Sequence, residues 1–173
     1  MAINGRRKGA RAERQLAALF TKWSGLKFSR TPSSGGLNWK AAHTKGDIVC
    51  TEEGHYFPFC IEAKFHNNVN FEHLLYLKEP EIMKFWAQCH RDAQKVSKMP
   101  LLFIRYNGLP KNFWFIMLKA DDYKAIYPEI CSGNYFKIIT TEVYVIMTPQ
   151  KLFGSDYKNL RRLVLKKYPK NKR

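Results

Sequence analysis

Two apolar stretches separated by a short polar segment constrain the fold of this chain more than any other feature. They run from Asp47 to Thr51 and from Phe57 to Phe65, with Glu52-Glu53-Gly54-His55-Tyr56 between them. This spacing predicts the two strands of a β-hairpin. Because the second stretch opens with Phe57-Pro58-Phe59-Cys60-Ile61, it is predicted to be a central strand of a sheet.

Apolar residues at helical spacing predict two helices, from about Lys8 to Trp23 and from about Glu81 to Lys98. The basic tail that begins at Tyr157 is predicted to be helical as far as Lys167. The order of the elements predicts an α/β fold, with a mixed central sheet flanked by helices. Further strands are expected at Leu26–Ser29, Leu101–Tyr106 and Asn112–Leu118, while Tyr135–Ile139 and Val143–Met147 either extend the sheet or stay peripheral.

The charge of the chain indicates the kind of partner. There are 30 Lys and Arg residues against 14 Asp and Glu, which gives a net charge of +16 over 173 residues. A chain this basic repels itself unless it meets a polyanion, and nucleic acid is the commonest one. On charge alone, a merely soluble basic protein and a protein of the membrane surface remain alternatives. The length fits one domain over residues 1–173.

Several classes of protein are disfavoured. No apolar run approaches the ~20 residues that span a membrane, and no apolar signal core follows the basic N-terminus. We therefore expect no membrane partner and a cytoplasmic location, at the nucleoid if DNA is the ligand. Cys50, Cys60, Cys89 and Cys131 form no CxxC pair, which predicts reduced, mostly buried thiols rather than a zinc site.

Asp47, Glu62 and Lys64 are the candidates for chemistry. Side chains alternate along a strand, so Glu62 and Lys64 share one face. If the turn centres near Gly54-His55, Asp47 lies opposite Glu62, whereas a shift of one residue would separate the carboxylates. Two converging carboxylates suit Mg²⁺, or Mn²⁺ in its place, and such a metal assists phosphodiester cleavage. Lys64 would orient or deprotonate a water and offset negative charge. The alternative is an exposed polar face of the hairpin.

Glu13 adds a third carboxylate. It falls on the apolar stripe of the first predicted helix, three residues before Leu16. An acid in that position is unusual unless it has a partner. It is predicted either to form a buried ion pair, with Lys64 or a residue near Arg14, or to serve as a further metal ligand, directly or through water.

An ordered series of motifs resembles a known family. The segment Arg7-Lys8-Gly9-Ala10-Arg11-Ala12-Glu13-Arg14-Gln15-Leu16 is similar to the R-K-G-x-x-A-E-R-x-L opening of archaeal-type Holliday-junction resolvases, which belong to the PD-(D/E)XK nuclease superfamily. The resemblance covers about Arg6 to Leu118, and residues 119–173 form an extension outside it. The later motifs of the family correspond here to Arg30, Ser33-Ser34-Gly35-Gly36, Gly46-Asp47-Ile48-Val49 and Ile61-Glu62-Ala63-Lys64.

The resemblance implies a restriction-endonuclease-like fold and a magnesium-dependent endonuclease that acts in DNA recombination and repair. Such an enzyme resolves four-way junctions by paired cuts as a homodimer. The loop between Arg30 and Asp47 is longer than in the archaeal enzymes, and a bacteriophage origin would suit such a variation. Other DNA substrates (duplex ends, flaps or restriction sites) and a non-catalytic basic DNA-binding protein are the alternatives.

Residue roles follow from the same resemblance. Glu13, Asp47, Glu62 and Lys64 are expected to be catalytic or metal-binding, and the loop serine of the family corresponds to Ser33 or Ser34. Apart from the resemblance, the aromatic and apolar residues of segment 71–77 are expected to supply either a dimer interface or core; they are Phe71, Leu74, Leu75, Tyr76 and Leu77. The basic residues expected to contact DNA are Arg7, Lys8, Arg11, Arg30, Lys40 and Lys45.

Overall fold

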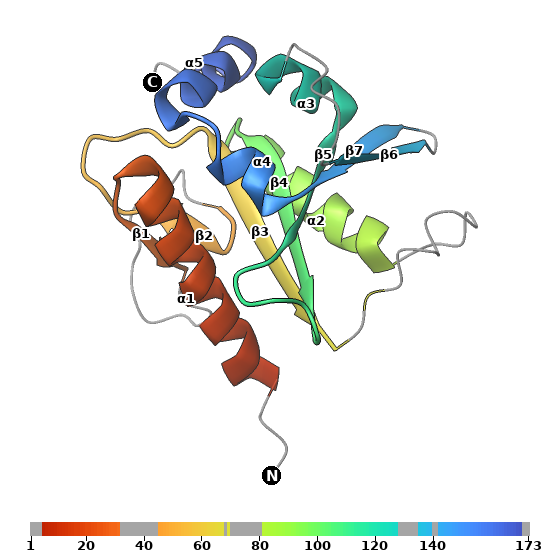
Figure 1. The fold of residues 1–173 in the computed structure, drawn as a ribbon. Helices are drawn as coiled ribbons and strands as arrows, with labels where there is room; N and C mark the ends of the chain where they lie inside the picture. The colour runs from red at the N-terminus through yellow and green to blue at the C-terminus, as the bar shows by residue number, and fades with distance from the viewer. Residues whose placement is uncertain are drawn as a thin grey trace.

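A seven-stranded sheet in the order β1-β2-β3-β4-β5-β7-β6 forms the centre of the molecule (Figure 1). The computed structural model describes residues 5–31, 45–67, 69, 81–127, 135–139 and 142–170. The strands are β1 (Phe28–Arg30), β2 (Ile48–Cys50), β3 (Phe59–His66), β4 (Met99–Tyr106), β5 (Phe115–Lys119), β6 (Tyr135–Ile139) and β7 (Val143–Met147). The helices are α1 (Gly5–Ser24), α2 (Glu81–Lys95), α3 (Ala120–Ile126), α4 (Pro149–Phe153) and α5 (Tyr157–Lys167).

Strand β3 lies between β2 and β4, so the predicted central strand is confirmed. It runs parallel to β4 along its whole length, from Phe59 opposite Met99 to His66 opposite Tyr106. The other pairs of neighbouring strands are antiparallel. The predicted mixed sheet flanked by helices is therefore confirmed, and the arrangement is that of a restriction-endonuclease-like fold.

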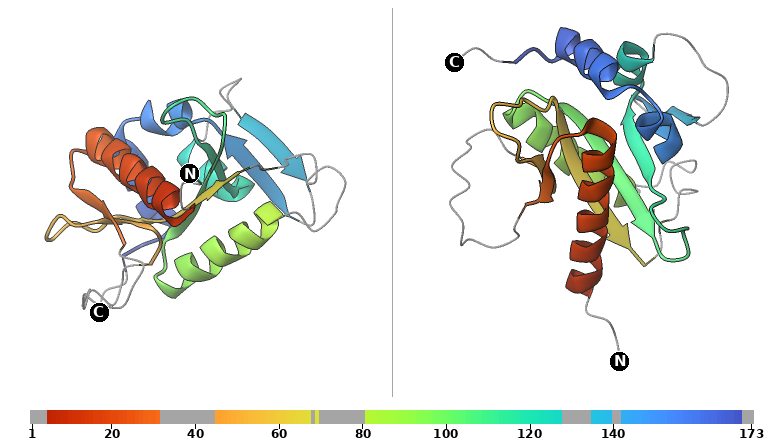
Figure 2. Two further views of the ribbon diagram at one scale, coloured as in Figure 1. Left: turned by 90° about the horizontal axis from the view of Figure 1, so that it is seen from below. Right: turned by 60° about the vertical axis from the view of Figure 1, so that its left-hand side comes forward.

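The helices cover both faces of the sheet. Helices α1 and α4 lie on one face and α2 lies on the other, as the view from below shows (Figure 2). On the first face, the buried ring of Phe20 in α1 contacts Phe103 of β4 and Phe153 of α4. On the second, Trp86 of α2 meets Tyr144 of β7 edge to face. Burying such aromatic groups drives the packing of both layers.

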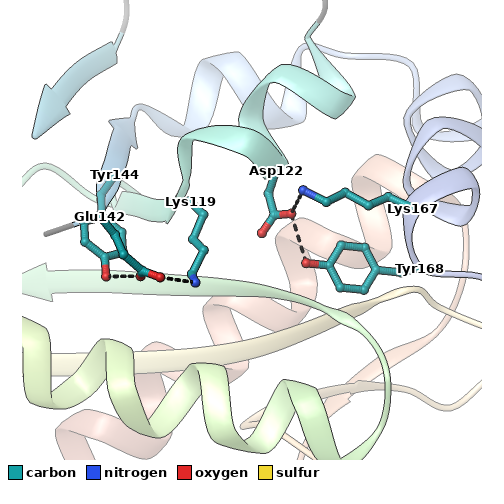
Figure 3. A network of polar contacts seen from close by, with 6 residues as sticks. All are labelled: Lys119, Asp122, Glu142, Tyr144, Lys167 and Tyr168. Carbon is teal, nitrogen blue, oxygen red and sulfur yellow. Dashed lines mark hydrogen bonds and ion pairs between the residues drawn. The ribbon is translucent and has the colours of Figure 1, made fainter. Parts of the chain in front are cut away.

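A buried carboxylate fastens the C-terminal segment to the rest of the molecule (Figure 3). Asp122 of α3 is 2% exposed, and its Oδ1 lies 2.7 Å from Nζ of Lys167 and accepts a hydrogen bond from the Tyr168 hydroxyl at 2.9 Å. A buried charge is tolerated only when it is paired and hydrogen-bonded. Figure 3 also shows Glu142 between Lys119 and Tyr144, where it accepts from both.

Most predicted elements are confirmed within a few residues, with three differences. The short helices α3 and α4 were not predicted. Strand β5 begins at Phe115 rather than Asn112, because Asn112 adopts a left-handed conformation (φ 62°) in a turn. The second helix ends at Lys95, and Ser97 turns the chain with φ 52°.

The structure also bears on the predictions for the cysteines and for membrane insertion. Cys60 and Cys89 are buried and Cys50 is half-buried, and all three are free thiols as predicted, while Cys131 lies outside the described residues. Among the described residues, no helix has the length and apolar character required to cross a bilayer.

Candidate active site

The β2–β3 pairing brings Asp47 to the side of Glu62. Ile48 stands opposite Ile61, which is the register that the turn at Gly54-His55 predicts. The Asp47 N–H donates to the Ile61 carbonyl at 2.7 Å, and Asp47 Oδ2 accepts from the Ala63 N–H at 2.8 Å. These two bonds fix the Asp47 side chain against β3, so the predicted convergence of the carboxylates is present.

Gly46 makes this approach possible. Its φ is +96°, a conformation that residues with a Cβ rarely adopt. A Cβ at this position would overlap the backbone of Ile61. The glycine before Asp47 therefore allows the chain to cross closely over β3 and place the carboxylate beside Glu62.

Glu62 and Lys64 form a buried polar cluster on the face of β3 that α2 covers. The Glu62 side chain is 4% exposed, and its Oε1 lies 2.7 Å from Lys64 Nζ. Gln88 of α2 donates its Nε2–H to the same oxygen at 2.8 Å and accepts from Lys64 Nζ at 3.1 Å. The Lys64 ammonium also lies 5.6 Å from the centre of the Phe85 ring. These contacts place the Lys64 ammonium beside the Glu62 carboxylate.

Asp47 carries negative charge that its surroundings do not neutralise. Burial, and then the nearby charge of Glu62, raise the pKa of its carboxyl to about 6, with Glu13 adding to the effect. The Ala63 N–H and the charge of Lys64 pull the pKa in the opposite direction but do not cancel the rise. A divalent cation between Asp47 and Glu62 would remove this deficit of positive charge, so the oxygen donors present fit Mg²⁺.

Glu13 is held by an arginine that the sequence did not indicate as its partner. Arg30 Nε of β1 lies 2.7 Å from Glu13 Oε2, and both side chains are about three-quarters buried. The expected pairing with Lys64 or with a residue near Arg14 was therefore wrong. Within the described ranges, no three His, Cys, Asp or Glu side chains form a ready-made metal cluster. The candidate ligands are thus Asp47 and Glu62, with Glu13 in an outer position.

Of the six residues expected to contact DNA, Arg30 is half-buried and paired with Glu13. Arg7 and Arg11 are exposed on α1 with half-buried Lys8 between them, and Lys45 is exposed just before Gly46. Ser33, Ser34, Lys40 and residues 71–77 lie outside the described residues.

Gln88 is the site residue that the sequence did not indicate. It lies on a helix more than twenty positions after Glu62, and a polar residue on an amphipathic helix is usually solvent-facing. Its only sequence signal is its place on the same helix as the buried residues Trp86 and Cys89.

Comparisons with known proteins show what the chain is similar to. The model of the family described as "Phage putative PDDEXK endonuclease" matches residues 4–159. The chain is similar to "Protein D14" of Escherichia phage T5, with 30% identity over 124 residues that cover 70% of this chain and 75% of that protein. No solved structure matches the chain.

Proposed function

Because the chain belongs to the phage putative PDDEXK endonuclease family, we propose that it is a Mg²⁺-dependent DNA endonuclease whose metal is held by Asp47 and Glu62. Membership of the family places the chain in the PD-(D/E)XK superfamily and supports a nuclease. The observation that carries the metal assignment is the convergence of two carboxylates from neighbouring strands, one of which has its pKa raised to about 6.

The proposed reaction is hydrolysis of a phosphodiester. A water gives up a proton as its oxygen bonds to phosphorus, the bond between phosphorus and the leaving oxygen breaks, and the leaving oxygen takes up a proton from solvent. When bound, the metal supplies Lewis-acid stabilisation of the charge that develops on the phosphate. Asp47 and Glu62 would hold it through carboxylate oxygens, the ligands that Mg²⁺ prefers.

Lys64 is proposed to stabilise the transition state and orient the attacking water. An ammonium in a largely buried site acts more strongly on developing negative charge than one in water. The Lys64 side chain is 20% exposed, and its contacts with Glu62 and Gln88 limit its motion. Gln88 is a positioning residue, because it touches both of these charged groups from α2.

The proposed substrate is the four-way DNA junction. The support is the ordered motif series from Arg7 to Lys64 in the sequence, which resembles junction resolvases. Resolution needs cuts in two opposing strands, so we propose a two-fold dimer with one active site per subunit. Other DNA forms remain the second candidate, because the metal site does not depend on the shape of the substrate.

Cleavage of matched DNA molecules tests the proposed substrate. A labelled four-way junction and a linear duplex with the same arm sequences are incubated with Mg²⁺ and with EDTA. We expect two symmetric nicks in the junction, only with Mg²⁺, and a native mass of two chains. Equal cleavage rates on the junction and the duplex would indicate that the substrate is DNA in general rather than the four-way junction. No cleavage of any DNA would favour a non-catalytic DNA-binding protein.

A further inference from the structure

A basic cleft of about 860 Å³ lies between the N-terminal half of α1 and the turn that joins β4 to β5. The two segments lie side by side at the end of the molecule where the N-terminus emerges (Figure 1). Among the described residues that line the cleft, none is acidic. Its basic residues are Arg7, Lys8, Arg11, Arg14, Arg105 and Lys111.

Helix α1 presents its basic residues as a row. Arg7, Arg11 and Arg14 are spaced by four and three residues, so they lie along one side of the helix. Seven residues of α-helix extend about 10 Å, so the row can reach successive phosphates of a nucleic-acid strand. Glu13 lies on a different side of α1 and pairs with Arg30, so it does not neutralise this row.

Arg105 builds the opposite wall of the cleft. Its guanidinium donates hydrogen bonds to the carbonyls of Pro110 and Phe113, each at 2.8 Å, and of Leu109 at 3.2 Å. These bonds tie the turn between β4 and β5 to β4. Lys111 is exposed in this turn and lines the cleft opposite α1.

The chemistry of the cleft suits a phosphate backbone rather than unpaired bases. Six basic side chains with no acid among them repel one another unless a polyanion lies between them. Base stacking needs the free face of an aromatic ring. Phe65 is the aromatic residue that lines the cleft, and the Arg105 guanidinium lies over its ring at 5.9 Å. Among the residues that the structure describes, the cleft thus offers charge and no free aromatic face for stacking.

The cleft is separate from the proposed metal site. Side chains alternate along β3, so Phe65 points to the opposite face from Lys64. Glu62 and Lys64 contact Gln88 of α2, whereas Phe65 lines the cleft beside α1. We infer that this cleft binds the phosphate backbone of double-stranded DNA at a distance from the bond that is cut. The inference rests on the proposed function only in taking DNA as the ligand.

A salt titration of DNA binding tests this inference. The variant Arg11→Gln/Lys111→Gln removes one exposed charge from each wall of the cleft. Lys124→Gln/Lys158→Gln removes two exposed charges on α3 and α5, remote from the cleft, and serves as the matched control. Binding to a linear duplex is measured without Mg²⁺ at several salt concentrations. The slope of log K against log salt should become less negative by roughly 1.8 in the cleft variant, from 0.9 per phosphate contact, and should not change in the control.

Kinetics add a readout that distinguishes binding from chemistry. With Mg²⁺, the cleft variant should have a raised KM and the wild-type cleavage rate at saturating DNA. Arg7→Gln/Lys111→Gln provides a second pair with the same expectation. An unchanged salt slope in both cleft variants would overturn the inference, as would a loss of binding confined to single-stranded DNA.

The outcomes separate this inference from the proposed function. If the wild-type protein cuts DNA but the cleft variants bind duplex as it does, the nuclease stands and the cleft assignment fails. If the wild-type protein does not cut DNA but the cleft variants lose salt-dependent binding, the cleft stands and the nuclease fails.

Discussion

Replacement of Asp47 by asparagine should stabilise the metal-free protein at neutral pH. Burial and the neighbouring Glu62 raise the pKa of the Asp47 carboxyl from 3.8 to about 6 in the folded protein. At pH values between 3.8 and about 6, the Asp47 carboxyl is protonated in the folded state and ionised in the unfolded state. The free energy of unfolding therefore falls as the pH rises through about 6. Asparagine has nearly the same shape and no charge, and its side-chain oxygen can still accept the hydrogen bond from the Ala63 N–H.

The size of the effect follows from the pKa. Each pKa unit corresponds to about 1.36 kcal/mol, and the pKa of Asp47 rises from 3.8 to about 6. Asp47→Asn should therefore raise the free energy of unfolding by about 3 kcal/mol above pH 6, and by about half of that at pH 5. For a chain of this length, each kcal/mol corresponds to roughly 2–4 °C in Tm.

Thermal unfolding in EDTA at pH 5 and pH 7.5 measures this gain. The exposed Asp121 of α3 provides the control variant Asp121→Asn, which should not change the Tm. Added Mg²⁺ should raise the Tm of the wild-type protein and leave that of Asp47→Asn unchanged, because a ligand stabilises only a state that binds it. An Asp47→Asn protein no more stable than the wild type at pH 7.5 would refute the reasoning.

Three further variants test the site, the C-terminal segment and the loop. Gln88→Ala should lower the saturating cleavage rate roughly tenfold with KM unchanged, because it frees Lys64 without removing a ligand; a change in KM alone would contradict this positioning role. Asp122→Ala should lower the free energy of unfolding by about 2 kcal/mol, less than for a fully buried pair because its lysine partner is partly exposed, and urea denaturation measures the loss. Ser33→Ala/Ser34→Ala should slow cleavage and leave junction affinity nearly intact in a binding assay; wild-type rates would show that these serines take no part in cleavage.

The sequence predicted the strongly periodic elements but not the short ones. Helix α3 has seven residues and α4 has five, too few turns for an apolar repeat to appear. The late start of β5 follows from the turn at Asn112, which Arg105 holds in place. Arg105 binds the carbonyls of the preceding turn, and a contact of that kind depends on the folded position of a side chain rather than on local propensity.

The convergence of Asp47 and Glu62 could be predicted because it depends on the register of one pair of strands. Once Ile48 stands opposite Ile61, Asp47 and Glu62 must meet. The partner of Glu13 could not be predicted, because Arg30 reaches it through the packing of α1 on β1. The contact of Gln88 with Glu62 likewise depends on how α2 packs on β3. Packing between distant segments leaves no periodic signal in a single sequence.

The most direct test of the central claim compares the wild-type protein with Glu62→Gln in a Mg²⁺-dependent nicking assay, with DNA binding measured in parallel. Glu62 is buried and supplies one of the two proposed ligands, while glutamine keeps its shape. We predict that Glu62→Gln binds DNA with wild-type affinity and no longer nicks it at any Mg²⁺ concentration. Undiminished nicking by this variant would contradict the assignment of the metal to Asp47 and Glu62.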